Sequence, residues 1–196
     1  MIRRSIYLLI VILLFQSCTS DSQKNLQELD VPNDNYIQNY LDNISKVSDN
    51  DSLISLVNNY EIELSGSLSD DEKSAYYSQL GVILYQHSLL TKADSSFHKA
   101  QIAFSNLGDS SRVSHMRMNR AAMNEMAGNF ENAVKIYHEV IDYFKRNNDS
   151  LQLANSYSNL GVAYQSMELA NNSLEYHKKA LAIRKAIFDT INIAYS

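Results

Sequence analysis

The sequence is poor in the residues that break helices or cross-link a chain. Its 196 residues include one proline, five glycines, one cysteine and no tryptophan. So few helix breakers favour long helices joined by short turns. A lone cysteine excludes an intramolecular disulfide, so the stability of the fold has to come from side-chain packing.

Positive charge is also in short supply. The formal net charge is −5, and removal of a leader that carries Arg3 and Arg4 would make it −5 − 2 = −7. Proteins that grip nucleic acid do so through clustered lysine and arginine. We therefore expect no nucleic-acid partner for this segment.

The N-terminus has the layout of a secretory signal. Arg3 and Arg4 are followed by the ten-residue apolar run Ile6–Phe15 and then by Gln16, Ser17 and Cys18. A basic start, an apolar segment and a small residue before the cut are typical of such signals. The run is too short to span a bilayer, which takes about twenty apolar residues.

The position of Cys18 resembles the leader of bacterial lipoproteins, in which the signal is cut before the cysteine and the cysteine thiol is the lipid attachment point. Phe15 and Gln16 depart from the aliphatic and small residues that these leaders prefer. The resemblance implies a signal peptide at 1–17, lipidation of Cys18 and a polar tether at 18–33. It also implies export and a lipid anchor in a bacterial envelope membrane, with the chain periplasmic or surface-facing. The alternatives are a conventional cleaved signal and an uncleaved anchor.

The rest of the chain repeats itself at steps of forty residues. A small residue recurs at Gly81, Ala121 and Gly161, each inside an expected helix. Further columns agree in the same register: Ala93, Ala133 and Ser173; Phe97, Tyr137 and His177; Ala100, Val140 and Ala180; Asp109, Asp149 and Asp189. A fixed period with two helical stretches per unit predicts a solenoid, in which each unit buries its apolar face against its neighbours.

These residues resemble the tetratricopeptide repeat family. The resemblance is carried by Asn159–Gly161 with Tyr164, by Ser173, Tyr176 and Ala180, and by Ala121, Gly128, Phe130, Ala133 and Tyr137 in the middle unit. The family's common period is about thirty-four residues, so the chain is similar to its longer-helix members. The resemblance implies an all-α, right-handed superhelical solenoid of antiparallel helix pairs.

The register divides the folded part into units. We expect a degenerate helix pair at 34–69, whose second helix is capped by Asp51-Ser52, and the start of an incomplete repeat at 189–196, capped by Asp189-Thr190. Between them lie three full repeats, at 70–108, 109–148 and 149–188.

Gly81 and Gly161 stand inside expected helices, where glycine costs about 0.5 to 1 kcal/mol relative to alanine. We interpret them as points where the partner helix of the pair comes close. The bulky residues Phe97, Tyr137 and Leu174 are expected to close over these points.

No pattern of catalytic residues is present. The sequence contains no HExxH, phosphate-binding glycine loop or GxSxG, and its five histidines fall on different expected helices: His87, His98, His115, His138 and His177. Glutamates are spread in the way of solvated helix faces: Glu125, Glu131, Glu139, Glu168 and Glu175. We expect no enzyme, no cofactor, no metal and no small-molecule substrate.

The first helix of each repeat carries the candidate binding residues. Gln79, Asn119 and Asn159 precede the small-residue column, one per repeat. The resemblance implies that these helices line a concave face, where such carboxamides hold the backbone of an extended peptide. Their neighbours would form an apolar floor with polar edges: Val82, Ala122 and Val162, then Tyr85, Glu125 and Gln165. The alternative is that the carboxamides tie adjacent helices together.

Arg117 and Arg120 interrupt the register, because the flanking repeats have tyrosine and leucine at these positions. A buried charge needs a partner. Three explanations stay open: a salt bridge to a nearby acidic residue, a change of helix phase that turns Met116 and Met123 inward, or contact with a carboxylate of a ligand.

The sequence as a whole predicts a non-enzymatic scaffold or adaptor of the cell envelope that binds a protein or peptide. Similar exported arrays also precede a transmembrane helix and a signalling domain, so the sensor portion of a longer regulator is an alternative. A subunit of an envelope enzyme is a third possibility, for which we find no catalytic residues.

Overall fold

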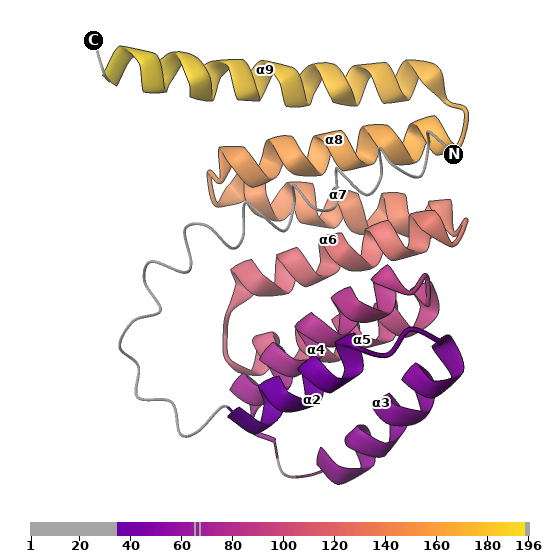
Figure 1. Ribbon diagram of the computed structural model, residues 1–196. Helices are drawn as coiled ribbons and strands as arrows, with labels where there is room; N and C mark the ends of the chain where they lie inside the picture. The colour runs from indigo at the N-terminus through magenta and orange to yellow at the C-terminus, as the bar shows by residue number, and fades with distance from the viewer. Residues whose placement is uncertain (1–34, 65, 67, 195–196) are drawn as a thin grey trace. The chain divides into compact units, whose positions relative to one another are not determined.

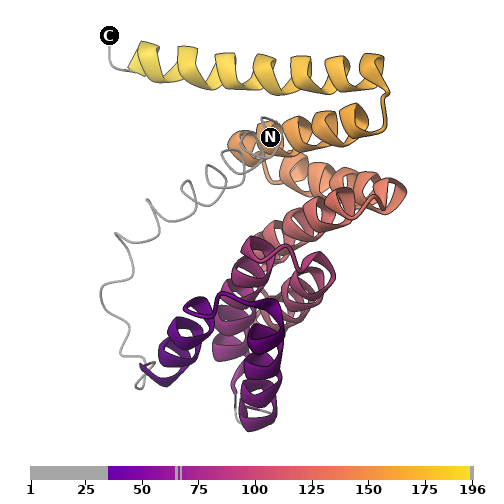
Figure 2. The same ribbon diagram turned by 45° about the vertical axis from the view of Figure 1, so that its right-hand side comes forward.

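The computed structural model describes residues 35–64, 66 and 68–194, and this part of the chain consists of helices without a strand. The helices are α2 (Asn35–Ser45), α3 (Asn50–Leu64), α4 (Asp70–Gln86), α5 (Leu90–Asn106), α6 (Ser110–Met126), α7 (Phe130–Arg146), α8 (Ser150–Ser166) and α9 (Ala170–Ala194). From α4 onward they follow one another side by side in chain order (Figures 1 and 2). The expected signal peptide, Cys18 and the whole of the expected tether at 18–33 lie outside the described residues.

The helix pairs coincide with the repeats of the sequence. We call α4, α6 and α8 the A helices and α5, α7 and α9 the B helices. Each A helix packs on the B helix that follows it, and the B helices α5 and α7 also pack on the A helix of the next repeat. The all-α solenoid of helix pairs that the forty-residue period predicts is therefore confirmed.

The turns between helices repeat at half the period. Residues with positive φ stand twenty apart, at Ser88, Gly108, Gly128, Asn148 and Glu168. At each of them the backbone N–H groups turn back to carbonyls of the preceding helix, as Gly108 does to Ser105 and Asp109 does to Phe104. This is the Schellman ending of a helix, which satisfies carbonyls that would otherwise lack a donor.

The expected start of a new helix at Asp189-Thr190 is wrong, because α9 continues through these residues to Ala194. Phe188 stands where the earlier helices have a residue in the left-handed conformation. A bulky aromatic residue strongly disfavours positive φ. The helix therefore does not turn there, and the repeat boundary between 188 and 189 disappears.

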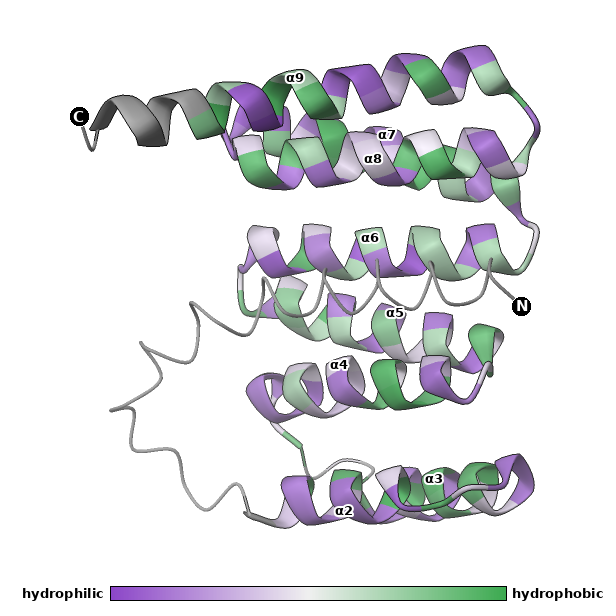
Figure 3. Ribbon diagram, turned by 45° about the horizontal axis from the view of Figure 1, so that its top comes forward, coloured by the Kyte–Doolittle hydropathy of each residue, from purple (hydrophilic) through white to green (hydrophobic). Residues whose placement is uncertain are grey.

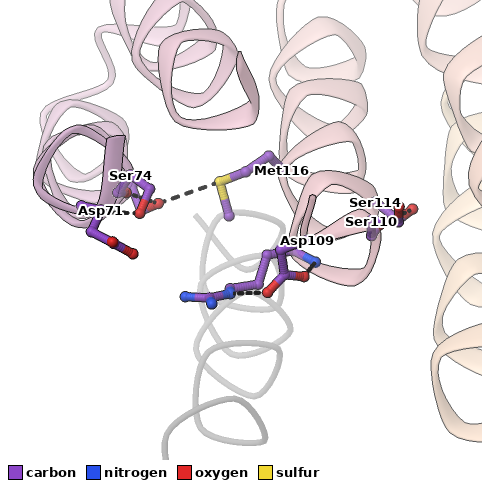
Figure 4. Close-up of polar contacts among 8 residues, drawn as sticks. Asp71, Ser74, Asp109, Ser110, Ser114 and Met116 are labelled. Atoms are coloured by element: carbon purple, nitrogen blue, oxygen red, sulfur yellow. Dashed lines mark hydrogen bonds and ion pairs between the residues drawn. The ribbon is translucent and has the colours of Figure 1, made fainter. Parts of the chain in front are cut away.

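The starts of α3 and of the A helices are fixed by side-chain caps, whereas α5 and α7 start without one. Ser69 and Glu72 form a reciprocal capping box at α4, and Asp109 accepts the backbone N–H of Arg112 at α6 (Figure 4). At α3 the cap is Asp49, which accepts from Ser52 N at 2.8 Å, so the expected cap at Asp51-Ser52 is misplaced by two residues. These bonds satisfy donors that the first turn of a helix leaves free.

Two apolar clusters form the core. The first joins α2, α3, α4 and α5 with Met123 of α6 and includes Tyr76, Leu80 and Phe97. The second joins α6 to α8 and includes Tyr137 and Leu160. Helix α6 contributes to both clusters, through Met123 to the first and through Met118 and Ala121 to the second.

The expected close approach of the partner helix is found at both Gly81 and Gly161, but the residue expected to cover Gly161 is wrong. A Cβ at Gly81 would lie 2.6 Å from the ring of Phe97. A Cβ at Gly161 would meet the ring of His177 at 2.9 Å, whereas the expected Leu174 is exposed. The repeat register favoured His177, which shares the column of Phe97 and Tyr137.

Candidate functional site

The A helices lie close enough to form a continuous face. The hydroxyl oxygen of Ser78 of α4 lies 3.6 Å from the sulfur of Met116 of α6. The hydroxyl oxygen of Ser156 of α8 lies at the same distance from the sulfur of Met118 of α6. Equivalent columns of the three repeats are thereby placed on successive, adjacent helices.

The predicted carboxamide ladder differs in accessibility along this face. Gln79 is exposed, Asn119 is half-buried and Asn159 is buried, with 8% of its surface accessible. No side-chain hydrogen bond joins any of the three to another residue in the described part of the chain. They therefore do not tie adjacent helices together by hydrogen bonds, as the alternative interpretation proposed.

The residues beside the ladder are partly accessible. Val82, Ala122 and Val162 are half-buried, as expected for the floor of a binding surface. Among the predicted edge residues, Tyr85 is half-buried and Gln165 is exposed. These positions leave apolar area and hydrogen-bonding groups available on one side of the A helices.

Glu125 contradicts both predictions made for it, since it is neither a solvated glutamate nor an edge residue. Its side chain is buried between three helices and accepts from Tyr137 Oη at 3.4 Å and from Ser166 Oγ at 3.3 Å. Burial disfavours the charged carboxylate and raises the pKa of Glu125 to about 7, against the smaller opposite effect of the two hydrogen bonds. Tyr137 was the available signal, because a tyrosine hydroxyl in a core column needs a polar partner.

Arg117 and Arg120 are ion-paired within the chain. The Nε atom of Arg120 lies 3.0 Å from Asp94 of α5, and its Nη1 atom donates to Gln101 at 3.1 Å. Arg117 lies 3.7 Å from Glu139 of α7. The salt-bridge explanation therefore accounts for both arginines. Met123 is also buried.

The Arg117–Glu139 pair replaces a different pair in the flanking repeats. Tyr77 stands at the equivalent position of the first repeat, and Lys99 Nζ lies 4.7 Å from the centre of its ring. Tyr157 occupies the same position in the third repeat, with Lys179 Nζ at 5.9 Å. One structural position thus holds a tyrosine with a lysine twice and an arginine with a glutamate once.

Neither a metal centre nor a membrane span is found in the part of the chain that the structure describes. No three histidine, cysteine, aspartate or glutamate side chains gather there as metal ligands. No helix among these residues combines the length and hydropathy that crossing a membrane requires.

Comparisons with known proteins agree with this geometry. Residues 112–186 match the family model of the tetratricopeptide repeat. The crystal structure of BtubC (BKLC) from P. vanneervenii is similar, with a TM-score of 0.59 and 25% identity over 76% of this chain and 61% of that one. The TPR domain of Arabidopsis FLU is similar with a TM-score of 0.55 and 14% identity, over 60% of this chain and 98% of that domain.

The fold is that of a tetratricopeptide repeat array. The family match covers most of the second repeat and most of the third, and the chain spans less than two thirds of the length of BtubC. A search of curated proteins found none that matches the array. A fold of this kind suits a scaffold for protein–protein interactions, and the residues that bind have to be argued from the site itself.

Proposed function

We propose that the chain is a non-enzymatic scaffold that holds a partner protein by an extended peptide laid across the A helices. The observation that carries this proposal is the carboxamide ladder. Gln79 and Asn119 present side chains that bond no other described residue, one on each of two adjacent helices. Asn159 adds least, because little of its side chain is accessible.

The chemistry of the ladder suits a peptide backbone. A carboxamide has both donor and acceptor groups, so it can satisfy the N–H and C=O of a strand that has no sheet partner. Packed helices lie about 8 to 10 Å apart, and an extended peptide advances about 3.3 Å per residue. One ladder contact is therefore expected at about every third residue of the peptide.

The experiment is selection of peptides on the full chain. Random twelve-residue peptides displayed on phage are selected on the immobilised protein, and an enriched peptide is then titrated by calorimetry. We expect Gln79→Ala with Asn119→Ala to weaken binding roughly tenfold, since each lost hydrogen bond is worth about 0.5 to 1.5 kcal/mol. Asn106→Ala, an exposed asparagine on a B helix, serves as the matched control.

Two outcomes contradict the ladder. One is a selected peptide that binds the double variant as tightly as the parent. The other is a selection in which no peptide is enriched above a surface without protein.

We further propose that the scaffold works at a bacterial envelope membrane, to which Cys18 holds it by a lipid. The proposal is supported by the basic start, the apolar run Ile6–Phe15 and the cysteine directly after it. Expression of the full chain with radiolabelled fatty acid, followed by membrane fractionation, tests it. We expect the radiolabel on the parent and none on Cys18→Ala. Unchanged membrane retention of Cys18→Ala would contradict the lipid anchor.

A further inference from the structure

Helix α9 carries a stripe of large apolar residues that face solvent. Leu174, Leu181 and Phe188 are 54%, 52% and 63% exposed. They stand seven residues apart, which places them on one side of the helix at steps of two turns. Figure 3 shows hydrophobic segments on α9 alternating with hydrophilic ones. Large exposed apolar side chains that recur on one helix face mark interaction sites in soluble domains.

The preceding repeats show what covers the same positions. In α7 the equivalents of Leu174 and Leu181 are Val134 and Ile141. Ile141 is buried in one cluster with Leu160 of α8, and Val134 packs against that cluster. An apolar pair on this B helix is therefore matched by an apolar residue on the A helix beside it.

The first repeat shows the polar version of the same junction. In α5 the equivalent residues are Asp94 and Gln101, and both bind Arg120 of α6, which occupies the position of Leu160. A polar pair on the B helix is thus matched by a polar residue on the next A helix, and an apolar pair by an apolar residue. Because α9 has leucine at both positions, its surface favours a covering helix with an aliphatic residue at the position of Leu160. It disfavours a covering helix with arginine at that position.

The charge of two lysines on α9 limits which kind of helix can bind on this face. Lys178 and Lys185 follow Leu174 and Leu181 by one turn, are exposed, and pair with no other residue in the described part of the chain. A second copy of α9 would place these lysines against the same lysines, which is unfavourable. An acidic helix would neutralise them.

We propose that α9 docks an acidic amphipathic helix of a partner protein, whose aliphatic side chain packs on Leu174 and Leu181 as Leu160 of α8 packs in the cluster of Ile141. This surface continues the junction that the array already forms between α7 and α8. It is separate from the carboxamide ladder on the A helices, so either site can fail without the other.

The probe is a lactam-bridged peptide with the sequence of α8, which covers the equivalent surface of α7. It carries Gly161→Ala to favour helix, and Leu151→Glu and Gln165→Glu at exposed positions to make it acidic. A second peptide adds Leu160→Arg. Circular dichroism verifies that both are helical before their binding to the full chain is measured by fluorescence anisotropy.

We expect the leucine peptide to bind the parent roughly tenfold more tightly than it binds Leu174→Asp/Leu181→Gln, which copies α5. The arginine peptide should show the reverse preference. Lys178→Glu/Lys185→Glu should weaken binding of the leucine peptide, with the largest loss at low salt. Ile102→Gln, an exposed apolar residue of α5, is the control and should change nothing.

Three results would overturn the proposal. The first is equal affinity of the leucine peptide for the parent and for Leu174→Asp/Leu181→Gln. The second is no binding by a peptide that circular dichroism shows to be helical. The third is self-association of the parent in sedimentation experiments that this variant abolishes, since a second copy would then be the occupant.

Discussion

Two junctions between repeats use equivalent positions of the repeat and opposite chemistry. Where α5 meets α6, the Arg120 guanidinium bonds Asp94 and Gln101, and Asn124 donates to Asp94 at 3.4 Å. Where α7 meets α8, the equivalent positions are occupied by Val134, Ile141 and Leu160, in one apolar cluster. The fold therefore fixes where two repeats touch, and the side chains at a few positions decide which repeats match.

This difference bears on both the stability and the specificity of the array. A solenoid is held by contacts between neighbouring units. Exchanging one partner of a polar junction leaves a charge without its counterpart, whereas exchanging all of them can be neutral. Each junction should thus tolerate complete replacement better than partial replacement.

The largest effect is expected inside a repeat, where the chemistry of the junctions plays no part. Gly81→Leu forces a side chain into the ring of Phe97, which is fully buried and cannot move aside. We expect it to lower the free energy of unfolding by about 3 kcal/mol, measured by urea denaturation.

Gly161→Leu is the matched comparison for Gly81→Leu. It should cost less, because His177 is half-buried and its ring can shift. If Gly161→Leu unfolded at the same urea concentration as the parent, the close approach of α8 and α9 would not be what selects glycine.

The next effect concerns Glu125, whose carboxyl group is buried between the second and third repeats beside Tyr137 and Ser166. Because burial raises the pKa of Glu125 to about 7, the folded chain keeps a proton that the unfolded chain releases near pH 4.5. Stability should therefore fall as pH rises from about 4.5 to 7, by up to about 3 kcal/mol.

Glu125→Gln should remove this fall in stability and make the protein more stable than the parent at pH 8. Urea denaturation of both proteins across the pH range measures the effect. Glu131→Gln, an exposed glutamate of α7, is the control. Parallel stability curves for the parent and Glu125→Gln would show that the buried carboxyl does not titrate in this window.

A smaller effect compares two buried hydroxyls at the same position of the first and third repeats. Tyr76 Oη has no hydrogen-bond partner among the described residues, whereas Ser156 Oγ donates to the carbonyl of Gln152 at 2.7 Å. We expect Tyr76→Phe to be neutral or stabilising by up to about 1 kcal/mol and Ser156→Ala to destabilise by about 1 kcal/mol. Thermal unfolding measures both, and destabilisation by Tyr76→Phe would reveal a partner for the hydroxyl.

Much of the fold could be predicted from the sequence because the forty-residue period marks the boundaries of the helix pairs. Gly81 and Phe97, and the residues at equivalent positions of the other repeats, lie in contact within each repeat. The pairing of helices therefore follows from the spacing of these residues alone. The end of α9 could not be predicted in this way. Asp189-Thr190 matches the earlier start signals, but α4 to α8 each end just before a residue with positive φ, a conformation that Phe188 disfavours.

The site was harder to predict. The repeat register shows which residues occupy equivalent positions, but it does not show how accessible each side chain is to solvent. Asn119 and Asn159 share a column, yet one is half-buried and the other is buried. Glu125 shares a column with Tyr85 and Gln165 and is nevertheless buried, since Tyr137 and Ser166 provide hydrogen bonds that the other repeats do not match. Such differences arise from side chains of adjacent repeats, which a single column does not include.

The most direct test of matched junctions is a mutant cycle at the α5–α6 junction. Arg120→Leu alone and Asp94→Val/Gln101→Ile alone should each cost about 1 to 2 kcal/mol, because each leaves polar groups without partners. Combining all three substitutions copies the α7–α8 junction and should restore the stability of the parent. If the combined variant instead lost the sum of the two separate losses, the junctions would not depend on matched chemistry.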